Sequence, residues 1–167
     1  MSTEDRKTIY LCLALFSEEG YEQKYVKEAF DTNWVVPMGP NVNAFEQNLA
    51  DFANANSDGS KLARKVVCLS AGTAAVHLAL IACGVKAGDE VCVQSFTFCA
   101  SSHPIIYLGA KPVFIDSERE TWNMDPELLE KAIIERKTVT GKYPKAIIPV
   151  ALYGMPYDCE RCMAIAD

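Results

Sequence analysis

The stretch Val66-Val67-Cys68-Leu69-Ser70-Ala71-Gly72-Thr73-Ala74-Ala75 joins an apolar run typical of a strand directly to residues 76–83, an apolar run typical of a helix. Small residues at such a junction let an anion approach the backbone. The first N–H groups of the helix point out at that anion, with the positive end of the helix dipole behind them. The junction therefore predicts a phosphate site. A tight strand-to-helix turn explains the same composition without any ligand.

Strand-like and helix-like runs alternate downstream of this junction to the end of the chain. We expect strands at residues 66–69, 90–94, 111–115 and 146–150, and helices at residues 73–83, 98–108, 125–134 and 158–167. This alternation predicts an α/β fold with a mostly parallel sheet. The strands are unbroken apolar runs, which indicates that helices cover both faces of the sheet.

The amino-terminal part has a different pattern. Residues 21–33 and 41–55 have the spacing of amphipathic helices, and the turn Pro37-Met38-Gly39-Pro40 separates them. We therefore divide the chain into an amino-terminal helical segment, residues 1–60, and the first part of the α/β domain, residues 61–167. The last helix reaches Asp167 without a cap or a polar tail, so we expect a chain truncated within a fold unit.

Composition limits the possible partners and compartment. The chain has 167 residues, half of them hydrophobic, a net charge of −6 and no long cluster of Lys and Arg, which argues against nucleic-acid and acidic-membrane binding. The run at residues 9–16 lacks the flanks of a secretory signal, and no apolar stretch is long enough to span a bilayer. Seven cysteines, mostly in apolar runs, indicate buried thiols in a reducing compartment, and we expect the cytoplasm.

No metal site is expected. Cys159-x-x-Cys162 has no further pair of ligands at a suitable spacing before the chain ends. His77 and His103 have no sequence partner for metal binding or for activating a nucleophile, so we interpret both as packed structural residues. Asp116, at the end of an expected strand, is interpreted in the same way.

An ordered series of motifs adds a resemblance to this interpretation. The series runs through Leu69–Leu80, Gly88-Asp89-Glu90-Val91, Ser95-Phe96-Thr97-Phe98, Gly109–Asp116, Trp122–Pro126 and Pro149–Pro156, and it begins at Pro37–Val42 with Phe45-Glu46. In this order and spacing it resembles the DegT/DnrJ/EryC1/StrS family of pyridoxal-phosphate-dependent sugar aminotransferases.

The resemblance implies a type I aminotransferase fold, of which the chain is part of the large domain, with active sites at a homodimer interface. Carried over to this sequence, the backbone of Gly72 and Thr73, with Ala71 beside them, would hold the phosphate of pyridoxal 5'-phosphate. Phe98 would stack on the cofactor ring. Met38, Gly39 and Pro40 would lie on the substrate side, near the partner subunit.

The resemblance also implies a reaction. Glutamate would give its amino group to a keto sugar linked to a nucleotide, a step of polysaccharide biosynthesis. The lysine that bonds to the cofactor and the aspartate that pairs with its pyridine nitrogen lie, in the family, beyond the point that matches Asp167. We therefore assign no catalytic residue, and we expect the 167 residues alone not to transaminate. Ala151 stands where family members often carry histidine.

Three other functions stay open at this point. A sugar dehydratase has the same fold, with histidine in place of the lysine. A nucleotide-binding module is disfavoured because neither G-x-G-x-x-G after a strand nor a P-loop occurs in the sequence. A non-catalytic fragment would expose a sheet edge and is expected to aggregate.

Overall fold

The computed structural model describes residues 15–55 and 63–167, and the chain divides between Cys68 and Leu69 into two compact units. Three expectations concern residues outside the described ranges. They are the domain boundary between residues 60 and 61, most of the apolar run at residues 9–16, and the burial of Cys12. Within the described ranges, no helix is both long and apolar enough to cross a membrane.

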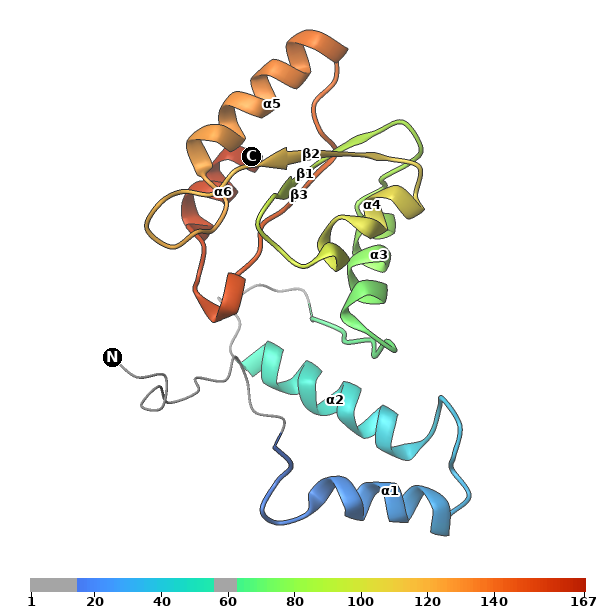
Figure 1. The fold of residues 1–167 in the computed structure, drawn as a ribbon. Coiled ribbons are helices and arrows are strands. Elements are labelled where there is room, and N and C mark those ends of the chain that lie inside the picture. Colours follow the sequence, from blue (N-terminus) through green and yellow to red (C-terminus); the bar gives the residue numbers. More distant parts are fainter. Residues whose placement is uncertain (1–14, 56–62) are drawn as a thin grey trace, which may run out of the picture. The chain divides into compact units, whose positions relative to one another are not determined.

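The first unit contains the two expected helices, α1 (Tyr21–Asp31) and α2 (Pro40–Ala55) (Figure 1). Pro40 is the first residue of α2, where its fixed φ suits the helix and its missing N–H leaves no bond unmade. Neither helix buries a side chain in this unit. The apolar faces that predicted the helices are therefore exposed, as Phe30 (67%) and Phe45 (56%) illustrate.

The expected strand at residues 66–69 is wrong, because this segment pairs with no strand among the described residues. Within it, the N–H of Cys68 donates a hydrogen bond to Glu46 Oε1 of α2 at 2.8 Å. Just before it, Asn54 of α2 exchanges two hydrogen bonds with the backbone of Arg64. Apolar character alone predicts an extended segment, and a strand also needs a hydrogen-bonding neighbour.

The second unit is built on a three-stranded sheet of β1 (Glu90–Gln94), β2 (Lys111–Ile115) and β3 (Ala146–Ile148), in the order β2-β1-β3. Both pairs are parallel, with Cys92 opposite Val113 on one side and Ile147 on the other, so the predicted parallel sheet is confirmed. β3 ends two residues earlier than expected. The N–H of Val150 bonds to the side chain of Gln94 rather than to a neighbouring strand.

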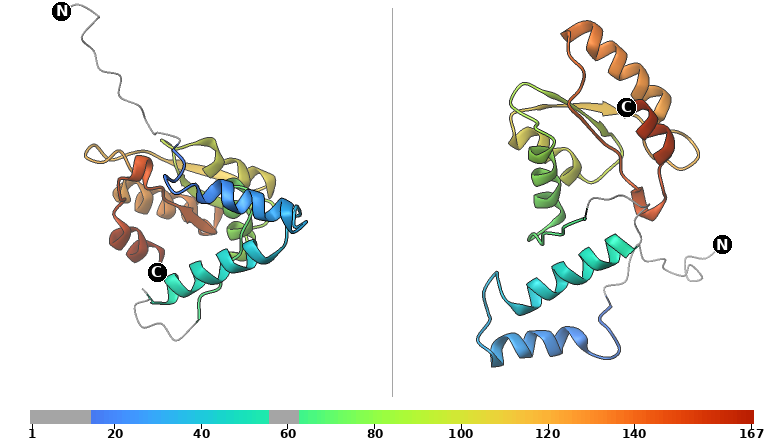
Figure 2. Two further views of the ribbon diagram at one scale, coloured as in Figure 1. Left: turned by 90° about the horizontal axis from the view of Figure 1, so that it is seen from below. Right: turned by 180° about the vertical axis from the view of Figure 1, so that it is seen from behind.

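Helices cover both faces of this sheet, as expected (Figures 1 and 2). α3 (Gly72–Ala82) and α4 (His103–Tyr107) lie on one face, and α5 (Pro126–Thr140) and α6 (Cys159–Ala166) lie on the other. Alternate residues of β1 point to opposite faces, and each set belongs to its own core. One core contains Leu80, Val85, Val91, Val93, Ile105 and Ala110, and the other contains Cys92, Ile115, Met124, Leu129 and Cys162.

Two predicted helices differ from the structure. In place of one helix at residues 98–108, a short 3₁₀ helix, η2 (Cys99–Ser101), precedes α4, because Pro104 has no N–H to continue the hydrogen-bond series. α5 runs past the expected end at residue 134 and stops at Gly141, whose φ of 75° caps the helix. The expected start of α5 is confirmed, since the Asp125 side chain accepts from two N–H groups of the first turn.

The cysteine prediction is partly wrong. Cys92 and Cys162 are buried and Cys68 is half-buried, but Cys83 and Cys99 are exposed. Cys83 caps the end of α3 and Cys99 begins η2, so both lie at helix ends rather than on the faces packed against the sheet.

Candidate functional site

The amino terminus of α3, in the second unit, is uncapped and open, as the predicted phosphate site requires. Ala71 is extended (φ −162°, ψ 158°), and its carbonyl accepts the first helical hydrogen bond, from Ala75 N at 3.1 Å. The N–H groups of the residues between them have no acceptor within the helix, and Ala71 has no polar side chain to cap them. A β-carbon on Gly72 would meet nothing within 4 Å, so an anion has room to approach.

The predicted ring-stacking residue belongs to an element next to this helix. Phe98 follows β1, is 77% exposed, and precedes η2, which packs against α3. A hydrogen bond of 3.0 Å between the hydroxyls of Thr97 and Ser101 fixes the backbone on either side of it. The exposed ring of Phe98 thus directly precedes an element that packs against α3.

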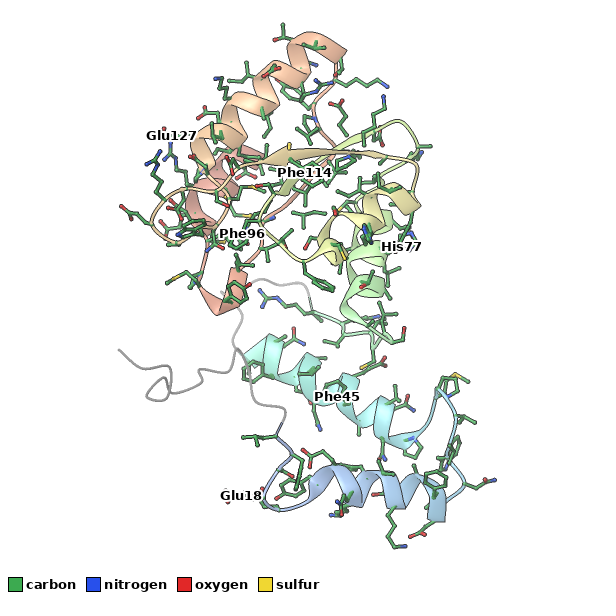
Figure 3. The ribbon with its side chains drawn as sticks, viewed as in Figure 1. Glu18, Phe45, His77, Phe96, Phe114 and Glu127 are labelled. Carbon is green, nitrogen blue, oxygen red and sulfur yellow. The ribbon has the colours of Figure 1, made fainter. Side chains whose placement is uncertain are left out.

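A hollow of about 550 Å³ lies at the carboxyl ends of β1 and β2. Phe96 and Trp122 line it, with their ring centroids 5.9 Å apart (Figure 3 labels Phe96). Asp116, at the end of β2, also lines it, and its carboxylate accepts from the N–H of Ser117 at 2.8 Å, which supports its structural interpretation. The carboxyl ends of parallel strands are where α/β folds place their ligands.

Trp122 is held in an unfavourable backbone conformation, with φ of 64°. The carboxylate of Glu118 secures this turn, because it accepts hydrogen bonds from both the N–H and the hydroxyl of Thr121. These bonds hold the pKa of Glu118 below its ordinary value, the Thr121 hydroxyl contributing most. A bulky residue with positive φ is strained, and such strain concentrates at functional sites.

The loop after β3 contains a second strained aromatic residue. Tyr153, in the 3₁₀ turn η3 (Leu152–Gly154), has φ of 52° and is 73% exposed. Each of the three strands is therefore followed by a loop with an exposed aromatic side chain, and two of these residues are strained. Ala151, the departure from the family pattern, is exposed at the start of this turn.

Two buried amide side chains connect these loops, and neither was predicted from the sequence. Gln94 is fully buried and hydrogen-bonds to the backbone of Phe96, Met124 and Val150. Asn123, 1% exposed, accepts from Leu152 N at 3.1 Å and donates to Met155 O at 2.9 Å. A polar residue ending the apolar run of β1 is the signal that could have identified Gln94.

The predicted substrate-side residues belong to the first unit. Met38 is 74% exposed, and Pro40 begins α2. Gly39 has φ of 151° and its carbonyl accepts from Asn43 N at 3.1 Å. A β-carbon there would lie 3.2 Å from the ring of Trp34, so the turn needs glycine for both space and conformation.

The two histidines pack against the same ring. Tyr107 lies 5.7 Å from His77 and 6.4 Å from His103 between ring centroids (Figure 3 labels His77). His77 is half-buried, as a packed residue should be, whereas His103 is exposed. In the part of the chain that the structure describes, no group of three or more His, Cys, Asp and Glu could hold a metal ion.

A model of the DegT/DnrJ/EryC1/StrS aminotransferase family matches residues 17–167. The chain belongs to this family. EpsN of Bacillus subtilis, provisionally described as a pyridoxal phosphate-dependent aminotransferase, is 48% identical over 161 residues, which are 96% of this chain and 39% of EpsN. The UDP-2-acetamido-2-deoxy-3-oxo-D-glucuronate aminotransferase of Pseudomonas aeruginosa is 41% identical, over 78% of this chain and 32% of that protein. The chain thus spans less than half the length of these relatives.

A solved structure of the family agrees in fold. Spr1654 of Streptococcus pneumoniae, provisionally titled a sugar aminotransferase and solved in a PLP-form, superposes with a TM-score of 0.66 at 33% identity. The match covers 86% of this chain and 33% of that one. The predicted fold class, an α/β aminotransferase domain with a parallel sheet, is confirmed.

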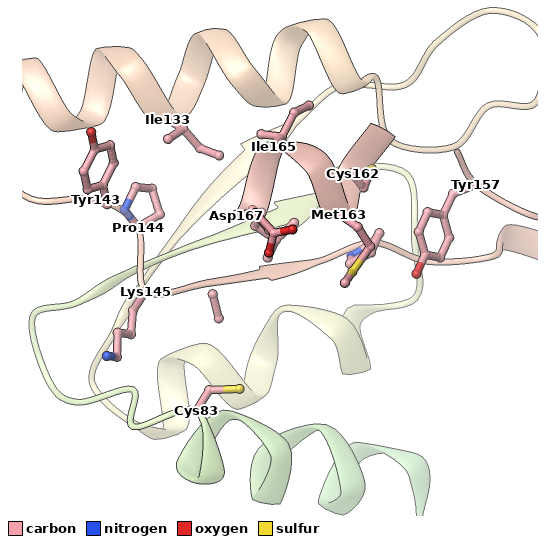
Figure 4. A pocket seen from close by; sticks show the side chains of 14 residues that line it. Cys83, Ile133, Tyr143, Pro144, Lys145, Tyr157, Cys162, Met163, Ile165 and Asp167 are labelled. Carbon is pink, nitrogen blue, oxygen red and sulfur yellow. The ribbon is translucent and has the colours of Figure 1, made fainter. Parts of the chain in front are cut away.

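A second hollow, of about 700 Å³, lies beside β3 and away from the predicted residues (Figure 4). Its walls are mostly apolar and include Ile133, Ile147 and Ile165. Burial raises the pKa values of Tyr157 and Cys162, which also line it, so both groups are neutral near pH 7. Neither Tyr157 nor Cys162 is therefore an activated nucleophile.

Proposed function

We propose that the protein containing this chain transfers an amino group to a keto sugar linked to a nucleotide, with pyridoxal 5'-phosphate as cofactor. Family membership supports the reaction class. The name of the Pseudomonas relative supports a nucleotide-linked oxo sugar as acceptor, and the PLP-form of Spr1654 supports the cofactor. Glutamate is the proposed donor.

The observation that carries this proposal is the uncapped amino terminus of α3, together with the exposed Phe98 that precedes an element packed against α3. The backbone of Gly72 and Thr73, with Ala71 beside them, would bind the cofactor phosphate through N–H groups and the helix dipole. Phe98 would cover one face of the ring and exclude water from it. These residues fit the group, since the site is uncapped, open and free of acidic side chains in its first turn.

When bound, pyridoxal phosphate supplies an electron sink that lets an amino group leave one carbon skeleton and join another. The residues of this chain bind and orient the cofactor in this proposal, and none of them is assigned a proton-transfer step. We propose that the cofactor-bonded lysine and the aspartate that pairs with the pyridine nitrogen come from outside residues 1–167.

We also propose a homodimer in the cytoplasm, with Met38, Gly39 and Pro40 on the substrate side. Exposed apolar side chains on α1, including Tyr25, Val26 and Phe30, support an interface because such patches mark association surfaces. In this proposal residues 1–60 form an amino-terminal helical segment that includes the substrate-side loop, and residues 61–167 form the first part of the cofactor-binding domain.

Isotope-labelled glutamate tests the reaction. The protein expressed from its complete gene is incubated with pyridoxal phosphate, labelled glutamate, and UDP- or GDP-linked keto hexoses, and the products are analysed by mass spectrometry. Labelled nitrogen in the sugar is the expected result. Loss of a sugar hydroxyl without incorporation of nitrogen would instead assign the protein to the dehydratases. Cofactor binding with neither product would indicate a non-catalytic module.

Two variants that each introduce one carboxylate test the site. Thr73→Asp places a carboxylate at the first turn of α3, where it repels the phosphate, so we expect cofactor binding to weaken by about tenfold or more. Thr138→Asp makes the same change on the exposed side of α5 and is expected to bind the cofactor normally. Equal cofactor affinity in both variants would contradict the assignment of the phosphate to α3.

A further inference from the structure

Gln94 is a fully buried polar side chain at the carboxyl edge of the sheet. It is the last residue of β1 and is 0% exposed. Its Oε1 accepts from Met124 N at 2.9 Å and from Val150 N at 3.3 Å, and its Nε2 donates to Phe96 O at 2.8 Å. A single side chain thus bonds to the backbone of the segments that follow all three strands.

Each bonded segment carries one of the exposed aromatic residues of this edge. Phe96 precedes Phe98 by two residues, Met124 follows Trp122 by two, and Val150 precedes Tyr153 by three. These distances along the chain are short enough that fixing the bonded backbone group limits where the aromatic side chain can lie. Since the bonds reach 30 and 56 residues along the sequence, no local turn replaces them.

Gln94 is the only polar residue among the fully buried residues of β1, where its neighbours are Val91, Cys92 and Val93. Its amide satisfies three backbone groups that an apolar side chain would leave without these partners, so it contributes to stability. The amide also adds geometry, because three directional hydrogen bonds allow one arrangement of the loops where apolar packing tolerates several. Asn123 adds a second connection between two of the same loops.

We infer that Gln94 is a positioning residue at the carboxyl edge of the sheet, where Phe98 would stack on the cofactor: it fixes the three loops that carry Phe98, Trp122 and Tyr153 relative to one another. This inference rests on the proposed function. Gln94 itself does not touch the cofactor in this account. It acts through the loops, and losing it loosens all three together.

The test uses Gln94→Met in the protein expressed from its complete gene. Methionine has a similar length and volume but forms none of the three hydrogen bonds. We expect the Kd for pyridoxal phosphate to rise about tenfold and the induced circular dichroism of the bound cofactor to decrease. Gln47→Met is the matched control, because Gln47 is an exposed residue of α2 whose amide donates to Asp51, on the same helix.

Amide hydrogen exchange of the cofactor-free protein gives a second readout that needs no cofactor. Gln94→Met is expected to speed exchange at residues 95–98, 122–125 and 149–153 together, while α5 exchanges as in the unmodified protein. Faster exchange at one loop alone in Gln94→Met, which lacks all three hydrogen bonds, would overturn the inference. So would a wild-type Kd and an unchanged circular dichroism in Gln94→Met.

A second variant decides the case if Gln94→Met does not fold. Gln94→Glu keeps an acceptor for the N–H groups of Met124 and Val150 but loses the donor to Phe96 O. We expect faster exchange only at residues 95–98, with weaker cofactor binding, and normal exchange at all three loops would overturn the inference. Failure of the unmodified protein to bind pyridoxal phosphate is a different result, because it refutes the proposed function itself.

Discussion

Tyr153 is held in a conformation that tyrosine disfavours, and its replacement has a calculable effect. Its φ of 52° and ψ of 26° lie in the left-handed region, where steric crowding of the β-carbon lowers the stability of the folded state by about 1–2 kcal/mol. Asparagine adopts this region more readily, as Asn33 does with φ of 59°. The Tyr153 side chain is 73% exposed, so little packing is lost with it. We expect Tyr153→Asn to raise the free energy of unfolding by about 1 kcal/mol.

Two matched variants separate backbone strain from the loss of a ring. Tyr143→Asn removes a tyrosine of similar exposure (65%) whose φ is not positive. It is expected to lower stability by about 0.5 kcal/mol, because Lys137 Nζ lies 4.5 Å from the ring centroid. Asn33→Tyr introduces the strained combination and is expected to lower stability by about 1 kcal/mol.

Urea unfolding of the four proteins measures these differences, and amino-transfer rates complete the test. If strain at the carboxyl edge serves the proposed reaction, Tyr153→Asn is more stable and yet slower than the unmodified protein. The reasoning is refuted if Tyr153→Asn is no more stable than the unmodified protein, or if Tyr143→Asn is stabilised to the same extent.

Three further predictions concern other parts of the second unit. Burial raises the pKa of the Cys92 thiol from 9 to about 11, so the stability that its neutral form contributes is complete below pH 9 and is lost as the pH rises to 11. In urea unfolding, Cys92→Val should therefore reduce the loss of stability between pH 9 and pH 11 by up to about 3 kcal/mol. Gly109→Ala should destabilise the protein by about 1–3 kcal/mol more than Gly141→Ala. Both glycines have positive φ, but only a β-carbon added at Gly109 would lie 3.1 Å from another side chain, that of Ala87. Equal melting temperatures of the two variants would contradict this. Asn123→Leu leaves two backbone groups without their partner and should lower the unfolding free energy by about 2 kcal/mol, and an unchanged value would show that water replaces both bonds.

Local sequence signals predicted much of the second unit. The bounds of β1 and β2 were predicted to the residue, because each is an apolar run that starts just after a glycine turn. The Asp125-Pro126 pair predicted the start of α5, because a helix cap is also a local signal that acts within one helical turn. The strand predicted at residues 66–69 was wrong, because the N–H of Cys68 bonds to the Glu46 side chain of α2. Apolar character does not encode the hydrogen-bond partners of a segment.

In the candidate site, too, the local features were predicted from the sequence and the features that depend on distant residues were not. The helix start at Gly72 and the exposed ring of Phe98 follow from a strand-to-helix junction and a motif, both of which are local. The strain at Trp122 and Tyr153 is invisible in the sequence, because either residue is ordinary until the loop around it forces φ positive. Gln94 was missed for a related reason, since its bonds join segments 30 and 56 residues away.

The central claim is that α3 binds the phosphate of pyridoxal 5'-phosphate, and a paired titration tests it most directly. The protein expressed from its complete gene is titrated with pyridoxal phosphate and, separately, with pyridoxal, which lacks the phosphate, while the ligand absorption spectrum is recorded. We predict a saturable spectral change with pyridoxal phosphate and binding of pyridoxal weaker by about a hundredfold or more. Equal affinity for the two ligands, or no spectral change with either, would contradict the claim.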